Sequence, residues 1–189
     1  MKRIIYLMKI GEISQSILSN LKKNLEDEFN KFNIRVDIFQ ESMKLRDAEY
    51  DVERNQYKAP KILRRLIERA KNERSFRILG ILDKDIYTKS YNFIFGIARR
   101  GSYAALISVA RLRENFYINN TIIHRKQETT KKFEKRILKE AIHELGHTFG
   151  LPHCYNNCVM RFSNSLADTD NKPAKFCSSC FLKMQTILL

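Results

Sequence analysis

The segment from His143 to His153 constrains the fold of this chain more than any other feature, because it has the form H-E-x-x-H-x-x-G-x-x-H. Side chains four residues apart lie on one face of an α-helix, so His143 and His147 can bind one zinc ion while Glu144 faces the open side of that metal. Gly150 can adopt the left-handed conformation that ends a helix, which brings His153 back as a third ligand. An ordinary helix with surface histidines is the alternative, and the added glycine and third histidine argue against it. The pattern predicts the layout of a zinc peptidase, with one metal position left free for water.

A second group of potential metal ligands, all cysteines, begins directly after His153 in the sequence. All four cysteines lie in the last fifth of the chain, and the final two form a C-x-x-C motif; they are Cys154, Cys158, Cys177 and Cys180. Four thiolates can close a tetrahedral zinc site, and a closed site is structural because no position remains for water. Two disulfides or an iron–sulfur cluster are the alternatives. We favour a structural zinc ion over both.

The rest of the sequence limits the cellular compartment in which the protein can be expected and the kinds of partner it can bind. The chain begins MKRIIYLMKI, where Lys9 interrupts the apolar run too early for a signal peptide, and no later segment is apolar enough to span a membrane. We therefore expect a cytoplasmic protein with no membrane partner. The net charge of +14 would allow nonspecific nucleic-acid binding at low salt, but the basic clusters also carry glutamates and fall on amphipathic helices. No recognised nucleic-acid module accompanies them.

Length and periodicity predict one compact α/β domain over residues 1–189. Apolar runs and alternating patterns predict strands at residues 3–10, 33–40, 76–82, 92–97 and 103–110. Helical spacing predicts helices at residues 13–29, after Pro60, and from Thr129 or Thr130 onwards. The last of these helices delivers His143 and His147 to a cleft. The polar connection over residues 41–60 is expected to be a long surface loop.

The segment from Ala141 to Met160, AIHELGHTFGLPHCYNNCVM, together with Cys177 and Cys180, resembles the archaemetzincins, a branch of the metzincin metallopeptidases. Two further stretches resemble the strands that precede the active-site helix in that family, at residues 79–87 and 91–112. The chain departs from the family pattern at one place, because only three residues separate Cys154 from Cys158 where the family spacing is one longer.

The resemblance implies an α+β fold in which a mixed twisted sheet carries helices, with the active-site helix below the cleft. Residues 1–150 would form an N-terminal subdomain with the sheet and this helix, and residues 151–189 a small C-terminal tail stapled by the structural zinc. The family also places a methionine turn beneath the catalytic zinc, here at Met160. The strand at 103–110 is then expected at the sheet edge, antiparallel to its neighbour.

These observations predict a zinc-dependent metallopeptidase that contains two zinc ions per chain and acts on peptide or protein substrates, with Glu144 as general base for a metal-activated water. Some metzincins place a tyrosine where this chain has Phe162, so no phenol at that position can stabilise an oxyanion. A zinc-stabilised protein that binds peptide or nucleic acid without turnover is the competing hypothesis. Because His153 is bonded directly to Cys154, we also hypothesise that the structural zinc positions the third catalytic ligand.

Overall fold

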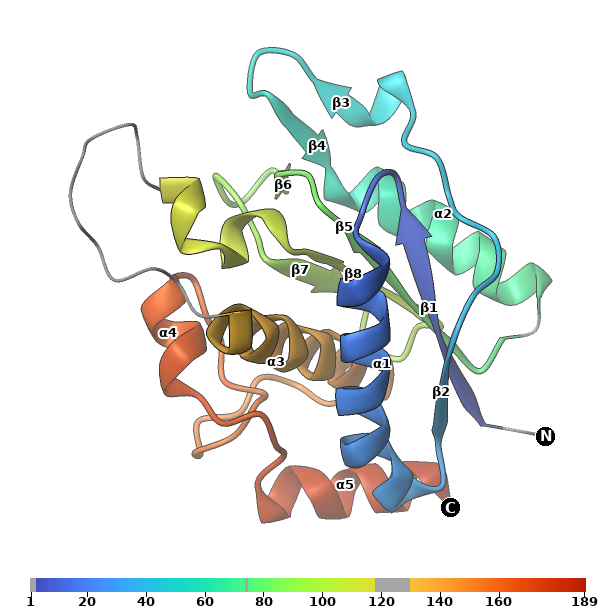
Figure 1. Ribbon diagram of the computed structural model, residues 1–189. Helices are drawn as coiled ribbons and strands as arrows, with labels where there is room; N and C mark the ends of the chain where they lie inside the picture. The colour runs from blue at the N-terminus through green and yellow to red at the C-terminus, as the bar shows by residue number, and fades with distance from the viewer. Residues whose placement is uncertain (1–2, 74, 118–129) are drawn as a thin grey trace.

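A computed structural model describes residues 3–73, 75–117 and 130–189 of the chain (Figure 1). Its centre is a five-stranded sheet in the order β2-β1-β5-β8-β7. The strands of this sheet are β1 (Ile4–Ile10), β2 (Arg35–Ile38), β5 (Arg77–Leu82), β7 (Gly96–Ala98) and β8 (Ala104–Ser108). All neighbours run parallel except β7 and β8, which pair antiparallel. The predicted mixed α/β fold is confirmed.

Helices cover both faces of the sheet, which explains why β5 and β8 are apolar runs rather than alternating ones. One face packs on α1 (Gln15–Phe29) and α3 (Thr130–Thr148), and the other packs on α2 (Ala59–Asn72) (Figure 1). The buried positions of α1 recur at helical spacing through Leu18, Leu21 and Leu25, so its apolar stripe faces the sheet.

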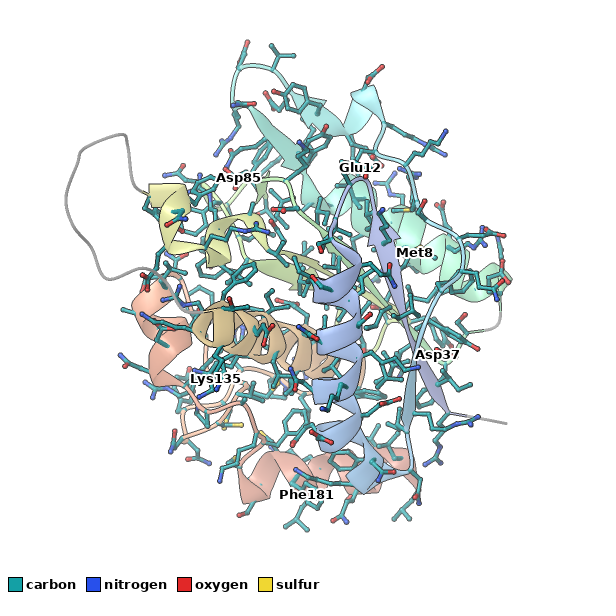
Figure 2. The ribbon with its side chains drawn as sticks, in the orientation of Figure 1. Met8, Glu12, Asp37, Asp85, Lys135 and Phe181 are labelled. Carbon is teal, nitrogen blue, oxygen red and sulfur yellow. The ribbon has the colours of Figure 1, made fainter. Side chains whose placement is uncertain are left out.

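The tail adds two helices to the first layer. Helix α4 (Leu166–Asn171) lies against α3, and α5 (Ser178–Leu188) passes beneath the end of α1 (Figure 1). Aromatic rings join α5 to the body of the protein, because Phe32 lies 4.8 Å from Phe181 between ring centroids, and Phe181 projects from α5 in Figure 2. Neither helix was expected from the sequence.

Two predictions about the sheet and its connections were wrong. The strand expected at the edge, residues 103–110, is β8, and it lies between β5 and β7 because all five of its residues are buried, as an interior strand requires. The edge strand on this side of the sheet is β7, and the antiparallel pairing of β7 with β8 agrees with the expectation.

Residues 41–60 are not a plain surface loop. They contain a 3-10 turn (Asp47–Glu49) and two short strands, β3 (Tyr50–Asp51) and β4 (Gln56–Lys58), which form a small second sheet with β6 (Ile86–Tyr87). The buried Glu49 carboxylate pairs with Arg65 of α2 at 2.6 Å, and this ion pair fixes the segment against the helix. Further 3-10 turns lie at Asn30–Phe32, Ala110–Leu112 and Glu114–Tyr117. In the described part of the chain, no helix is both long and apolar enough to cross a bilayer.

Candidate metal centre and cleft

The end of α3 and the turn after it bring three histidines to one point. The Nε2 atoms of His143 and His147 are 3.1 Å apart, and the ligand atoms of His143, His147 and His153 all lie within 4.8 Å of one another. Zinc–nitrogen bonds of ~2.0–2.1 Å in tetrahedral geometry place ligand atoms about 3.3 Å apart. The three imidazoles therefore fit a zinc ion.

Backbone carbonyls hold the two helical imidazoles in the tautomer that metal binding needs. His143 Nδ1 lies 2.9 Å from the Val159 carbonyl oxygen, and His147 Nδ1 lies 2.8 Å from that of Leu151. Donation from Nδ1 leaves the lone pair on Nε2. Burial lowers the pKa of His143 well below its usual range and also lowers the pKa of His147, so both rings are neutral ligands near neutral pH.

Gly150 makes the return of His153 geometrically feasible. Its φ of 93° lies in a region that residues with a Cβ rarely adopt, and no atom lies near the place where a Cβ would stand. The glycine is therefore required by the backbone conformation and not by packing. Its N–H donates to the His147 carbonyl at 2.9 Å and closes the helix end.

Met160 lies directly under the helix between the two histidines. A Cβ added to Gly146 would stand 2.4 Å from the Met160 sulfur, and the methionine side chain is fully buried. The contact needs a glycine at position 146, which the sequence analysis did not single out. Met160 packs against the helix at Gly146, as a supporting methionine turn would require.

Glu144 faces the cleft with one carboxylate oxygen that has no partner. The side chain is 6% exposed, and Oε2 accepts no hydrogen bond from the residues that the structure describes. Burial, followed by the nearby Glu140 carboxylate, raises the pKa of Glu144 well above its usual range, and Lys172 opposes this rise. A buried carboxylate oxygen without a partner is costly unless a ligand or a metal-bound group meets it.

The cleft beside these groups has a volume of about 250 Å³. One wall is the edge strand β7, where a Cβ added to Gly96 would stand 2.6 Å from Glu144 Cγ. Phe162 also lines the cleft, and its ring centroid is 5.3 Å from that of His153. A glycine inside a strand pattern often marks such a close approach, so the sequence did carry a signal for Gly96 that was missed.

A buried ion pair that includes a cleft-lining residue, Glu140, was also missed. Lys172 Nζ lies 2.9 Å from Glu140 Oε1, and both side chains are at most 4% exposed. Glu140 stands one helical turn before Glu144 on the same face, so its place in the cleft could have been inferred from spacing. No pattern pointed to Lys172, which reaches the site from the segment after α4.

The four cysteines form the second cluster, with all four sulfur atoms within 4.8 Å of one another. Cys154 Sγ and Cys177 Sγ are 3.8 Å apart, and none of the four is in a disulfide. Zinc–sulfur bonds of ~2.3 Å in a tetrahedron place sulfur atoms about 3.8 Å apart, whereas a disulfide needs about 2.05 Å. The donor set therefore fits a closed four-thiolate zinc site.

Hydrogen bonds to sulfur favour the thiolate at one of these cysteines. Burial raises the pKa of Cys177, but the backbone N–H of Cys180 and the side-chain amide of Asn156 outweigh it and lower that pKa to about 6. Burial raises the pKa of both Cys158 and Cys180. Backbone N–H groups of Met160 and Cys177 also point at Cys158 Sγ, at 3.5 and 3.3 Å, as donors do around a coordinated thiolate.

Comparison with known proteins identifies close relatives over the whole length. The model of peptidase family M54 matches residues 1–186. A protein of Pyrococcus furiosus named archaemetzincin is 40% identical over 187 residues, which cover 98% of this chain and 94% of that protein. An archaemetzincin of Saccharolobus solfataricus is 38% identical over 188 residues, covering 97% of this chain and 93% of the relative.

Solved structures give the same result for the fold. A crystal structure of archaemetzincin from Archaeoglobus fulgidus, complexed with malonate, matches with a TM-score of 0.75 and 34% identity, covering 95% of this chain and 99% of that one. Archaemetzincin from Methanopyrus kandleri matches with a TM-score of 0.77 and 31% identity, covering 99% of this chain and 96% of the other.

Proposed function

The chain belongs to peptidase family M54, and on that basis we propose that its peptidase centre consists of Glu144 as general base and His143, His147 and His153 as ligands of a catalytic zinc ion. It is a zinc metallopeptidase. The observation that supports this assignment most strongly is the unpartnered Glu144 Oε2, which faces the cleft beside the three clustered imidazoles.

Different groups in the cleft would supply metal chemistry, proton transfer and positioning of the peptide. When bound, zinc acts as a Lewis acid that polarises the attacking water and the substrate carbonyl. Glu144 accepts the proton of the water and passes it to the leaving amine. The outer edge of β7 offers backbone N–H and C=O groups from Gly96 to Ala98, which can pair with an extended peptide as an added strand. Such pairing positions a peptide without requiring particular side chains.

We further propose that Cys154, Cys158, Cys177 and Cys180 hold a second, structural zinc ion, so that each chain binds two. The 3.8 Å separation of the Cys154 and Cys177 sulfur atoms supports this proposal, as does the absence of any disulfide among the four. Thiols kept for metal binding suit a reducing compartment, which supports a cytoplasmic location.

The position of Met160 beneath Gly146 supports a metzincin-type active site. We propose one domain with two parts, residues 1–150 and a tail of residues 151–189. Apolar side chains from both parts share one core, in which Phe29 lies 6.2 Å from Phe149 and 6.4 Å from Phe176 between ring centroids. The competing hypothesis of a binding protein without turnover is not favoured, because the family model and the relatives describe peptidases or archaemetzincins.

Digestion of a diverse peptide mixture by the zinc-loaded protein, read by mass spectrometry, tests the assignment. Glu144→Gln keeps the side-chain shape and removes the base, so we expect it to retain zinc and to lose activity by about 10²–10⁴-fold. Glu134→Gln changes a carboxylate of the same helix that bonds Asn20 far from the cleft, and it should cleave normally. Equal cleavage by Glu144→Gln would remove Glu144 from its role, and no cleavage by a zinc-loaded wild type would favour binding without turnover.

A further inference from the structure

A second hollow continues the catalytic cleft. It has a volume of about 300 Å³ and shares Tyr91 and Asn164 with the cleft, so the two form one continuous surface. Arg54 and Lys89 line the second hollow, and no carboxylate lines it. The cleft therefore has a positively charged extension on one side.

Within the described residues, no ion pair neutralises the two cations of this extension. Nearby arginine side chains are paired, as in Arg111, whose Nε and Nη2 donate to the Asp85 carboxylate at 2.6 and 2.7 Å. Figure 2 shows Asp85 near the small second sheet. Asp51, close to Arg54 in sequence, accepts from the Tyr87 hydroxyl and pairs with Lys58 at 3.5 Å. Among the described residues, no carboxylate forms an ion pair with Arg54 or Lys89.

Arg54 is held in place with part of its guanidinium unused. Its Nε donates to Gln56 Oε1 at 3.0 Å, its Nη2 donates to the Asn92 carbonyl at 3.2 Å, and its Cζ lies 4.1 Å from the centroid of the Tyr87 ring. Nothing in the described chain accepts from Nη1. An arginine fixed in this way loses little conformational entropy when its free edge binds a carboxylate through two parallel hydrogen bonds.

The position of the hollow relative to β7 gives the direction of the substrate. The lining residues around Tyr91 precede Gly96–Ala98 in the chain, so the hollow lies towards the N-terminal end of this edge strand. Antiparallel pairing is the more stable arrangement for an added strand. A peptide bound in that direction points its C-terminal residues at Arg54 and Lys89.

Building on the proposed peptidase function, we infer that Arg54 and Lys89 form a subsite for a carboxylate on the C-terminal side of the scissile bond. The carboxylate is either the chain terminus of a short peptide or the side chain of Asp or Glu. The enzyme then prefers substrates that carry a negative charge a few residues after the cleaved bond.

Matched peptides test this inference. One pair shares its sequence and ends in a free acid or an amide, and a second series is amidated and carries Glu or Gln at each position after the cleaved bond. We expect kcat/KM for the better-placed acid to exceed that of its neutral partner about tenfold at low salt, and the preference to shrink as salt screens the charges. The first pair reports a chain terminus and the second series an acidic side chain.

Variants assign the preference to the two residues. Lys89→Gln and Arg54→Gln should each reduce the ratio of kcat/KM for the acidic peptide to kcat/KM for its neutral partner. Lys84→Gln, a change to an exposed lysine outside this hollow, should keep the full preference. Lys89 is exposed, so its replacement tests the inference even where Arg54→Gln disturbs the loop.

A binding measurement separates this inference from the peptidase assignment. The zinc-loaded Glu144→Gln protein should bind the acidic peptide more tightly than the neutral one in fluorescence anisotropy, whether or not the wild type cleaves either. Equal cleavage of all pairs would overturn the subsite and leave the peptidase function intact. No preference in binding, or a preference for acids only on the N-terminal side, would also overturn it.

Discussion

At the scale of single residues, Gly146 allows the Met160 side chain to pack closely against helix α3. A methyl group at position 146 would stand 2.4 Å from the Met160 sulfur and 3.3 Å from a Phe176 ring carbon. Alanine is the better helix former by about 1 kcal/mol, but overpacking of a buried contact costs about 1–3 kcal/mol. Since Met160 is fully buried, strain should exceed the gain in helix propensity.

We therefore predict that Gly146→Ala lowers the free energy of unfolding by about 1–2 kcal/mol and lowers kcat/KM, because His143 and His147 flank the shifted position. Urea denaturation and peptide cleavage measure the two effects. The matched background is Met160→Ala, in which the space for the methyl group exists. There Gly146→Ala should no longer destabilise, and an equal cost in both backgrounds would show that the contact with Met160 is not the cause.

At the scale of elements, charged hydrogen bonds attach the tail helix α4 to α3. Arg136 is 1% exposed and donates to the Asp170 carboxylate from Nε at 2.7 Å and from Nη2 at 2.6 Å. Lys139 Nζ donates to the Thr169 and Asp170 carbonyls at 2.9 and 2.8 Å. These contacts hold a six-residue helix that has little apolar surface of its own.

The ion pair between Arg136 and Asp170 makes the stability of the protein depend on pH. Burial raises the pKa of Asp170, but the hydrogen bonds and charge of Arg136 outweigh it and hold that pKa below its usual value. A folded-state pKa below the unfolded one gives stability that is present above the unfolded pKa and is lost as the pH falls through the folded pKa. Asp170→Asn should cost about 1–3 kcal/mol near neutral pH, and the cost should shrink as the pH falls below about 4, the ordinary pKa of an Asp carboxyl. Urea unfolding across that range measures it, and a cost independent of pH would contradict this origin.

Periodicity predicted the long elements and failed for the short ones. The helical spacing of residues 13–29 matches α1, and the strand expected at 76–82 is β5. Strands of two or three residues, such as β3 and β4, have no period to detect. Helix α4 did carry a signal, since Ser165 Oγ accepts from the backbone N–H of Asp168 as an N-cap does. The order of strands in the sheet depends on tertiary packing, which is why the edge was misplaced.

The same distinction holds at the site. The spacing of ligand-type residues in the sequence anticipated that the histidines and the cysteines would come together. The histidines lie on the end of α3 and the turn after it, and the cysteines form two closely spaced pairs, one after α3 and one at the start of α5. Gly96 lies against Glu144, and Lys172 pairs with Glu140. In each case the two residues come from different segments of the chain. Contacts of this kind depend on how the layers of the fold pack, so they cannot be predicted from residue spacing in a single sequence.

At the scale of the whole molecule, one loop contributes residues to both the histidine cluster and the cysteine cluster. His153 and Cys154 are adjacent, yet they lie in different clusters. The Cys154 N–H donates to the Met160 carbonyl at 3.0 Å, and the Val159 N–H donates to the Lys175 carbonyl at 2.9 Å. The carbonyl of Val159 in turn meets His143 Nδ1 at 2.9 Å. The loop therefore ties the tail to the catalytic helix through its backbone.

This connection predicts that loss of the second metal weakens catalysis as well as stability. Cys177→Ser removes a thiolate from the four-sulfur cluster and leaves His153 unchanged, so the protein should bind less zinc, unfold at lower temperature and lose about 10–100-fold in kcat/KM. Tyr155→Ala alters a fully exposed side chain in the same loop and should change none of these. Zinc content by elemental analysis, thermal unfolding and peptide cleavage on the same samples separate the effects. A folded Cys177→Ser protein that holds one zinc ion and cleaves at the wild-type rate would show that the tail does not position His153.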